Sequence, residues 1–206
     1  MIEDNDMHIG DYGWAAHAPH SSQYLNPVVL ELVQAAGGQT VLDAGCGNGE
    51  LAGYLASHGY RLSGVDADAE GIAIARRRFP DCNFAVSRFS KDPKAVFDLV
   101  VSTEVVEHLY APHELANYCF DALRPGGTFI ISTPYHGYFK NLALALSGRW
   151  GRHLAPNWHG GHIKFWDRQS LTGLLVEAGF VVTGFRGVGR MPLLWKSMVL
   201  IARKPG

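Results

Sequence analysis

The stretch Val41-Leu-Asp-Ala-Gly-Cys-Gly-Asn-Gly49 decides the fold of this chain. Apolar residues end at Asp43, as at the end of a buried strand, and three alternating glycines follow before a helical pattern begins at Glu50. Glycines let a ligand approach the backbone because they carry no Cβ atom. The helix start adds unpaired N–H groups and a partial positive charge. The stretch therefore predicts a strand–turn–helix ligand cradle.

A second strand pattern, Arg61–Val65, ends at Asp66. Dinucleotide-binding folds place a ribose-binding acid at this position, about 20 residues after the glycine turn. A carboxylate accepts hydrogen bonds from ribose hydroxyls, and Asp66 can equally cap a helix that starts near Ala69. We expect an adenosine-containing ligand.

The glycine spacing D-x-G-x-G-x-G differs from the nicotinamide fingerprint, because Glu50 stands where a third glycine is required. The spacing resembles motif I of the class I S-adenosylmethionine-dependent methyltransferases. The resemblance continues through Phe97–Ser102, Glu104–Leu109 and Leu123–Thr128, the last being a turn before the fifth strand. Within the family the chain is most similar to ubiquinone-biosynthesis O-methyltransferases, through Asn26-Pro27, Glu104–His108 and the residues after Pro134.

This resemblance implies S-adenosyl-L-methionine as the cofactor and a set of residues that contact it. Residues matching Gly45, Asp66 and Thr103 contact the cofactor in those enzymes, whereas an arginine that binds its carboxylate is replaced here by Val29. The ends of the predicted strands complete the expected contacts, which are Asp43, Gly45, Cys46, Gly47, Asp66, Ala67 and Thr103. Phe89 either covers the adenine or belongs to the core.

Strand and helix patterns alternate along the chain, which predicts a Rossmann-like, doubly wound and mostly parallel seven-stranded sheet. Strands are expected at 40–44, 61–65, 83–86, 97–102 and 128–132, and helices at 26–36, 49–58, 69–79, 112–123 and 168–178. The strand-like runs Phe180–Arg186 and Leu194–Arg203 are too close together for a crossover helix, so they should pair antiparallel. We expect one domain over 1–206, with an arm at 1–25 and a substrate cap at 134–167.

Composition excludes several classes of protein. A net charge of −1 over 206 residues argues against a nucleic-acid partner. Three cysteines without a C-x-x-C pair favour reduced thiols and a cytoplasmic location. The polar, acidic start is unlike a secretory signal, and no apolar run reaches the length of a membrane span.

Methyl transfer to a hydroxyl or phenol needs a base, and His108 follows the fourth strand at the expected mouth of the site. His108 and Glu107 can instead simply shape this loop. Glu104, Glu107 and His108 can also hold a divalent cation, although the three ligands suit magnesium poorly. No zinc spacing joins His153, His159 and His162, so we expect no metal site there and none overall.

The expected partner is a small-molecule methyl acceptor, with substrate choice made by the cap. Residues 138–152 combine an apolar run with basic residues, and no acidic residue lies between Asp121 and Asp167. This pattern suits either a lid that contacts anionic lipid, peripheral to a membrane, or a cap packed on its own domain. Two other functions stay open, a non-catalytic S-adenosylmethionine-binding protein and an NAD-dependent oxidoreductase.

Overall fold

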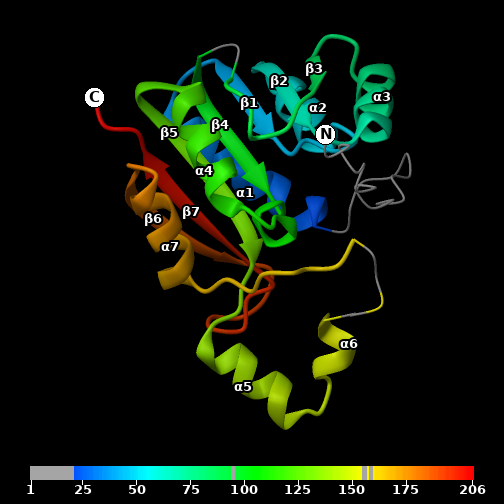
Figure 1. The fold of residues 1–206 in the computed structure, drawn as a ribbon, viewed down its shortest axis with the longest axis vertical. Coiled ribbons are helices and arrows are strands. Elements are labelled where there is room, and N and C mark those ends of the chain that lie inside the picture. Colours follow the sequence, from blue (N-terminus) through cyan, green and yellow to red (C-terminus); the bar gives the residue numbers. More distant parts are fainter. Residues whose placement is uncertain (1–20, 94–95, 155–156, 158–159) are drawn as a thin grey trace, which may run out of the picture.

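A single seven-stranded sheet organises the chain (Figure 1). The computed structural model describes residues 21–93, 96–154, 157 and 160–206. The strand order is β3-β2-β1-β4-β5-β7-β6. The strands are β1 Thr40–Ala44, β2 Arg61–Asp66, β3 Asn83–Val86, β4 Phe97–Thr103, β5 Leu123–Pro134, β6 Val181–Val188 and β7 Ser197–Arg203. The α-helices are α1 Ser22–Ala36, α2 Glu50–Ala56, α3 Ala69–Arg78, α4 Pro112–Ala122, α5 Tyr138–Leu146, α6 Trp150–Leu154 and α7 Arg168–Glu177, and a short 3₁₀ helix, η1, covers Val106–His108.

The sheet is parallel except at its C-terminal edge. Strands β1 to β5 pair in parallel, whereas β7 pairs antiparallel with both β5 and β6. This arrangement confirms the predicted fold class. The strand order reverses direction between β1 and β4, so the carboxyl ends of these two strands flank the position where open sheets bind ligands.

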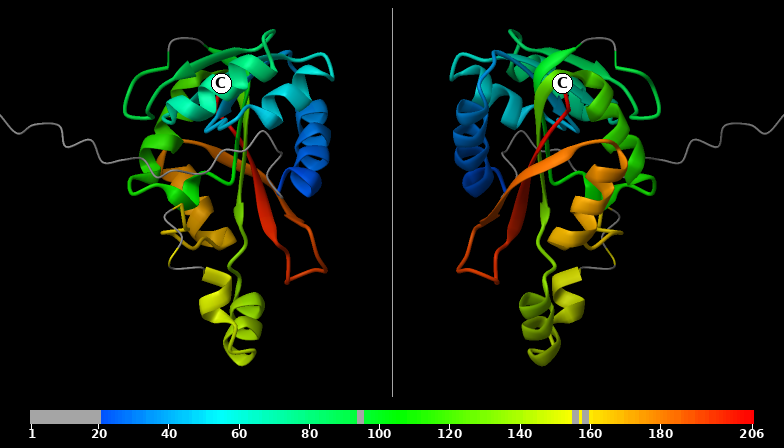
Figure 2. Two further views of the ribbon diagram at one scale, coloured as in Figure 1. Left: turned by 90° about the vertical axis from the view of Figure 1, so that its right-hand side faces the viewer. Right: turned by 90° about the vertical axis from the view of Figure 1, so that its left-hand side faces the viewer.

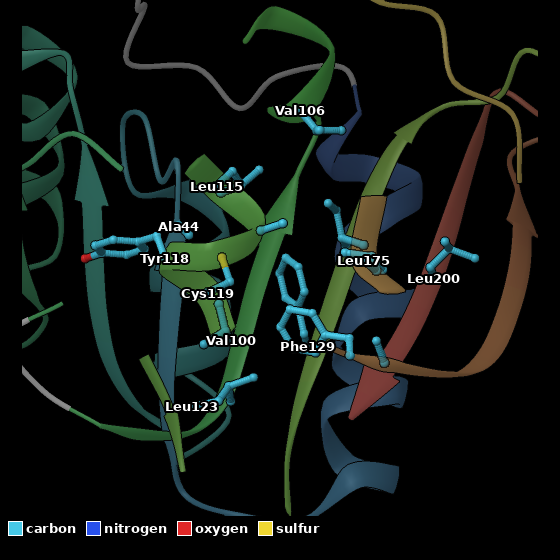
Figure 3. Packing of buried hydrophobic residues seen from close by; sticks show 14 of the residues in the cluster. Ala44, Val100, Val106, Leu115, Tyr118, Cys119, Leu123, Phe129, Leu175 and Leu200 are labelled. Carbon is cyan, nitrogen blue, oxygen red and sulfur yellow. The ribbon is translucent and has the colours of Figure 1, made fainter. Parts of the chain in front are cut away.

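Helices cover both faces of the sheet (Figure 2). Alternate strand residues point to opposite faces. Leu42, Val100 and Phe129 pack with residues of α4 and α7, whereas Val41, Leu99 and Ile130 pack with residues of α1, α2 and α3. Figure 3 shows the first of these two cores, in which Phe129 lies between α4 and α7. Burial of both faces explains why the central strands are apolar throughout.

Two element boundaries differ from the sequence-based expectation by more than three residues. Helix α1 begins at Ser22 rather than Asn26, so residues 22–25 of the predicted N-terminal arm belong to this helix, and Ser21 is its N-cap residue. Residues 1–20 of the predicted arm lie outside the described residues. Pro27 is the sixth residue of this helix, so its missing N–H leaves the carbonyl oxygen of Gln23 without its i→i−4 hydrogen bond. Strand β5 begins at Leu123 rather than Thr128, and the predicted turn is an irregularity within the strand, because Phe97 pairs with Leu123 but Leu99 pairs with Thr128.

The segment after β5 projects from the body of the protein (Figure 1). It contains α5 and α6 and returns to the sheet through an isolated bridge between Tyr135 and Trp166. Among the described residues, no helix has the length and apolar character needed to cross a bilayer.

Candidate active site

The glycine turn after β1 is held by the end of β2. The backbone N–H groups of Gly45 and Cys46 both donate to the carbonyl oxygen of Val65, at 2.8 and 3.1 Å. Gly45 has φ 85°, and a Cβ atom there would overlap the Val105 side chain. Gly49 also has positive φ and directly precedes α2. Only glycine fits these positions without strain, because left-handed backbone disfavours residues with a Cβ atom.

Asp66 joins the turn to the start of α3. Its Oδ2 accepts a hydrogen bond from the Gly47 N–H at 2.8 Å, and its Oδ1 accepts one from the Asp68 N–H at 2.9 Å. Burial raises the pKa of Asp66, although both of these N–H groups favour the ionised form. The alternative role as a cap of α3 is wrong, because Asp68 occupies the N-cap position and accepts from the Glu70 N–H at 2.9 Å.

Asp43 lies beneath the turn and is 2% exposed. Burial, followed by the nearby charge of Asp66, raises its pKa to about 7, whereas the backbone N–H of Ala52 acts in the opposite direction. A buried and a half-buried carboxyl group therefore lie close to each other at the carboxyl ends of β1 and β2.

The remaining predicted cofactor contacts occupy this same edge of the sheet. Ala67 directly follows β2, and Thr103 is the last residue of β4; both are half-buried. Cys46 is buried, and its Sγ faces the backbone of Gly64. Burial also raises the pKa of this thiol. Cys46 can therefore contact a ligand through its backbone only.

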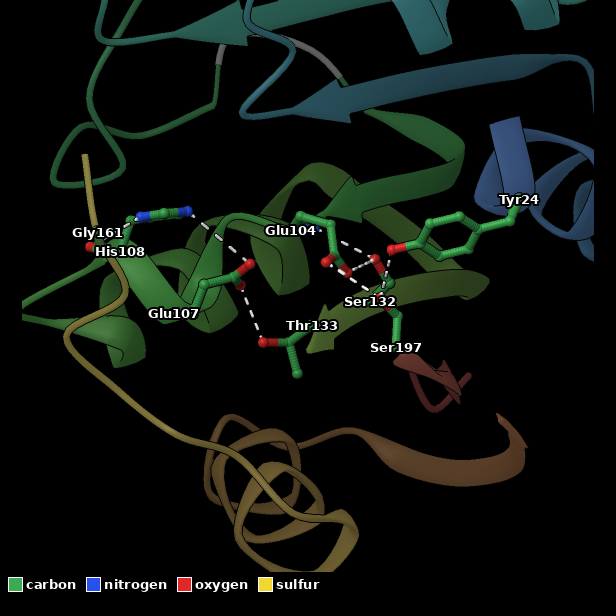
Figure 4. Close-up of polar contacts among 8 residues, drawn as sticks. All are labelled: Tyr24, Glu104, Glu107, His108, Ser132, Thr133, Gly161 and Ser197. Carbon is green, nitrogen blue, oxygen red and sulfur yellow. Dashed lines mark hydrogen bonds and ion pairs between the residues drawn. The ribbon is translucent and has the colours of Figure 1, made fainter. Parts of the chain in front are cut away.

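Glu104 follows β4 and is the centre of a polar network (Figure 4). Its Oε1 accepts from the Ser132 hydroxyl at 2.8 Å, and its Oε2 accepts from the Ser197 hydroxyl at 3.1 Å. The Tyr24 hydroxyl lies 3.2 Å from Ser197 Oγ, which connects α1 to this network. Burial raises the pKa of Glu104 to about 7, while both serine hydroxyls favour its ionised form. Glu104 itself has φ 55°, an unusual conformation for a residue other than glycine.

Glu107 and His108 point to a different side of the same loop (Figure 4). Glu107 is 1% exposed; its Oε2 accepts from the Thr133 hydroxyl at 2.9 Å, and its Oε1 has no hydrogen-bond partner among the described residues. His108 Nε2 lies 3.9 Å from this Oε1, and His108 Nδ1 lies 3.3 Å from the Gly161 carbonyl oxygen. Burial raises the pKa of Glu107 and lowers the pKa of His108.

The structure brings His162 to this pair. Its ring packs edge-on against His108, with 4.9 Å between the ring centroids. Ligand atoms of Glu107, His108 and His162 lie within 4.8 Å of one another. The three residues that could hold a cation therefore differ from the predicted Glu104, Glu107 and His108, because Glu104 is turned toward Ser132 and Ser197. His159 lies outside the described residues.

Comparison with known proteins places this geometry in a family. The profile of the family described as "Methyltransferase domain" matches residues 17–184. The chain is a class I S-adenosylmethionine-dependent methyltransferase.

Relatives and solved structures are consistent with this assignment. A Mycolicibacterium smegmatis protein named "Probable S-adenosylmethionine-dependent methyltransferase" is 34% identical over 78% of this chain and 59% of its own length. A ubiquinone biosynthesis O-methyltransferase of Hydrogenovibrio crunogenus is 27% identical over 82% of this chain and 75% of its own length. The fold resembles that of Synechocystis magnesium protoporphyrin IX methyltransferase, which was solved with S-adenosylhomocysteine bound, with a TM-score of 0.68 at 17% identity over 87% of this chain and 82% of that one.

The residues at the carboxyl ends of β1, β2 and β4 fit S-adenosylmethionine, the cofactor of this methyltransferase family. A carboxylate can accept about four hydrogen bonds, so Asp66 retains capacity for ribose hydroxyls beside its bonds to Gly47 and Asp68. Val29, which replaces the expected arginine, is fully buried in the core beneath α1. The carboxylate of the cofactor therefore has no cation at this position.

Four residues of the site were not predicted from the sequence. Ser132 and Ser197 come from β5 and β7, Tyr24 comes from α1, and His162 comes from the cap. No local motif marks these serines or Tyr24, since they meet Glu104 only through tertiary packing. His162 lies 54 positions after His108, at no recognisable ligand spacing.

Proposed function

We propose that this methyltransferase transfers a methyl group to a hydroxyl or phenol oxygen of a small, hydrophobic or quinone-like acceptor, with His108 as the general base. The names of the ubiquinone biosynthesis O-methyltransferases that it resembles support an oxygen acceptor. The observation that carries the proposal is the setting of His108, next to buried Glu107 in the loop that follows β4.

The environment of His108 suits a base. Burial lowers its pKa, so the imidazole is neutral at physiological pH and can accept a proton. A hydrogen bond from Nδ1 to the Gly161 carbonyl would leave Nε2 as the basic nitrogen. Glu107 Oε1 lies 3.9 Å from Nε2, so the buried Glu107 carboxyl would help to orient the His108 ring.

Little further chemistry is required of the protein. S-adenosylmethionine, when bound, supplies an electrophilic methyl group on a sulfonium. The Gly45–Gly47 backbone and Asp66 would hold the cofactor, with Asp43, Ala67 and Thr103 around them. The cap and His108 would orient the acceptor, since positioning the reactants supplies most of the rate enhancement in such a displacement.

We also propose that residues 138–152 contact the surface of an anionic membrane, through which a hydrophobic acceptor would be reached. Several large apolar side chains of α5 and α6 are exposed, among them Tyr138 (73% exposed), Leu146 (80%) and Trp150 (44%). Arg149 and Arg152 lie beside them without an acidic neighbour in sequence. Exposed apolar residues next to cations suit the interface of anionic lipid.

The test of the catalytic proposal is transfer of a labelled methyl group from S-adenosylmethionine to a cell extract, followed by partition between organic and aqueous phases and then by alkaline treatment. Label that enters the organic phase as a stable ether supports the proposal. Label that is confined to polar amines or esters would contradict it. A thermal-shift assay serves as the control: a higher Tm with S-adenosylhomocysteine, and an unchanged Tm with NAD, shows that the protein binds the expected cofactor.

A further inference from the structure

A small basic pocket lies between the cap and the segment that precedes β7. Its volume is about 130 Å³, and its lining combines three cationic side chains with three histidines. The lining residues are Pro134, His136, Lys140, His153, Leu154, His162, Arg190 and Lys196. Among the residues that the structure describes, no carboxyl group lines this pocket.

Lys140 is the most unusual of these residues because its side chain is buried, at 6% exposure. Its Nζ donates to the Lys196 carbonyl oxygen at 3.2 Å. Among the described residues, Glu50, Asp98 and Glu31 form ion pairs with Arg78, Arg124 and Arg186, respectively. No described carboxylate is within ion-pair distance of the three cations of the pocket. The carboxylate whose charge acts on Lys140 is Glu104, which already accepts hydrogen bonds from Ser132 and Ser197.

A buried cation is normally paired, because removal from water costs it several kcal/mol. Here burial and the neighbouring charge of Arg190 lower the pKa of Lys140 to about 8. An anion in the pocket would supply the missing partner. The Lys140 ammonium has N–H groups left for it beside the bond to Lys196.

The histidines of the pocket add hydrogen-bonding groups that carry no charge. Burial, followed by the charge of Lys140, lowers the pKa of His136 to about 4. Burial is the largest cause that lowers the pKa of His162 to about 4, and electrostatic repulsion from His108 is the next. Neutral imidazoles can donate to anionic oxygens through one nitrogen.

The pocket adjoins the proposed base. His162 lines the pocket and also packs edge-on against His108, 4.9 Å away between ring centroids. Lys196 also lines the pocket; its Nζ lies 5.0 Å from the centroid of the Tyr24 ring, and Tyr24 belongs to the Glu104 network. A ligand that reaches from His108 past His162 would place its far end among the cations.

We infer that this pocket binds an anionic group of the methyl acceptor, a carboxylate or a phosphate, with Lys140, Arg190 and Lys196 as its cationic partners. The inference rests on the proposed function and narrows it, since the acceptor then carries an acidic group in addition to the hydroxyl that is methylated.

A pair of probes that differ by one carboxylate group tests the inference. Catechol and 3,4-dihydroxybenzoate are titrated calorimetrically into protein saturated with S-adenosylhomocysteine. We expect the carboxylated probe to bind the wild-type protein about tenfold or more tightly than catechol, as charge-assisted hydrogen bonds imply. Lys140→Met and Arg190→Gln should each reduce this preference severalfold, whereas Arg77→Gln, an exposed cation of α3 outside the pocket, should leave it unchanged.

Two variants keep the test valid if one of them fails to fold. Lys140 is buried, but Arg190 is exposed and its replacement should not disturb packing. Equal binding of the two probes to the wild-type protein would overturn the inference, as would an unchanged preference in both variants.

Control titrations distinguish an anionic group of the methyl acceptor from two other anions that could occupy the pocket, the carboxylate of the cofactor and a lipid phosphate. If the Lys140 and Arg190 variants lose affinity for S-adenosylhomocysteine itself, the pocket serves the carboxylate of the cofactor, and the inference is wrong. If they lose binding to phosphatidylglycerol vesicles but keep the probe preference, the pocket holds a lipid phosphate, and the inference is again wrong. Failure of the wild-type protein to bind S-adenosylhomocysteine would instead contradict the proposed function.

Discussion

The Asp66 carboxylate holds the glycine turn of the neighbouring strand, because its Oδ2 accepts a hydrogen bond from the backbone N–H of Gly47 at 2.8 Å. The acid at the end of β2 thus both shapes the turn after β1 and remains available to a ribose. A contact with the ribose in addition to this hydrogen bond would explain why the two features occur together in the sequence, about 20 residues apart.

Replacement of Asp66 should weaken cofactor binding without preventing folding. We expect Asp66→Ala to raise the Kd for S-adenosylhomocysteine about tenfold or more, since it removes charge-assisted hydrogen bonds to the ligand. Asp68→Ala is the matched control: it removes the N-cap of α3 and should lower the free energy of unfolding by about 1 kcal/mol with little change in Kd. Calorimetric titration and thermal unfolding measure the two effects. Equal Kd values for Asp66→Ala and the wild type would show that Asp66 is only structural.

His108→Gln should abolish most of the methyl transfer while leaving the cofactor bound. Loss of a general base lowers kcat about 10²–10⁴-fold, and the Kd for S-adenosylhomocysteine should not change. His113→Gln, an exposed histidine of α4, is the control. In the wild type, kcat should rise with pH through an apparent pKa below the ordinary imidazole value of about 6.5, because burial favours the neutral form of His108. A kcat that is independent of pH and of His108 would remove the base from the mechanism.

Chelation should leave methyl transfer unchanged. Although Glu107, His108 and His162 lie close enough to share an ion, burial raises the pKa of Glu107, and a protonated carboxyl is a poor ligand. His108 must also be uncoordinated to act as a base. Activity measured after dialysis against EDTA, with and without added Mg²⁺ or Zn²⁺, checks this expectation. Loss of activity that is restored by one of these ions, and not restored in His162→Gln, would place a metal in the site.

Asp43 and Glu104 should each reduce the free energy of unfolding as the pH rises from about 4 to about 7, whereas His136 and His162 act in the opposite direction because burial lowers their pKa values to about 4. Asp43 and Glu104 have pKa values of about 7 in the folded protein, whereas carboxyl groups of an unfolded chain titrate near pH 4. Between these values the unfolded state binds fewer protons at these two carboxyl groups, so each of them lowers the free energy of unfolding by at most about 1.4 kcal/mol per pH unit. Denaturant titrations at several pH values should therefore show a slope of the free energy of unfolding against pH that is more positive in Asp43→Asn and in Glu104→Gln than in the wild type. A slope that is unchanged in both variants would contradict the assignment.

Removal of apolar side chains from α5 should weaken membrane contact. Phe139 is 54% exposed and Leu146 is 80% exposed. If both enter the lipid interface, Phe139→Ser/Leu146→Ser should reduce co-sedimentation with anionic vesicles about tenfold or more, since each side chain contributes about 1.5–3 kcal/mol on burial. Val176→Ser, at a 56% exposed position of α7, is the control. Absence of binding by the wild type at low salt would end the membrane proposal.

The sequence by itself determined the parallel part of the sheet and the position of the ligand cradle. Local sequence patterns are enough to predict these features, because each depends on backbone geometry over a few residues. The features are the apolar strands, the glycines from Gly45 to Gly49 and the acid Asp66. The antiparallel pairing of β6 and β7 was equally readable, because the connection between them is too short for a crossover helix.

Only the tertiary structure decided which side chains meet in the active site. It separated Glu104 from Glu107, joined Glu104 to Tyr24 and Ser197, and brought His162 against His108. These contacts connect residues up to 173 positions apart. Local periodicity cannot encode them, because they arise from the way in which β7 and the cap pack against the loop after β4. The unpaired charge of Lys140 is of the same kind, since a lysine in a helix is read from sequence as solvated until packing buries it.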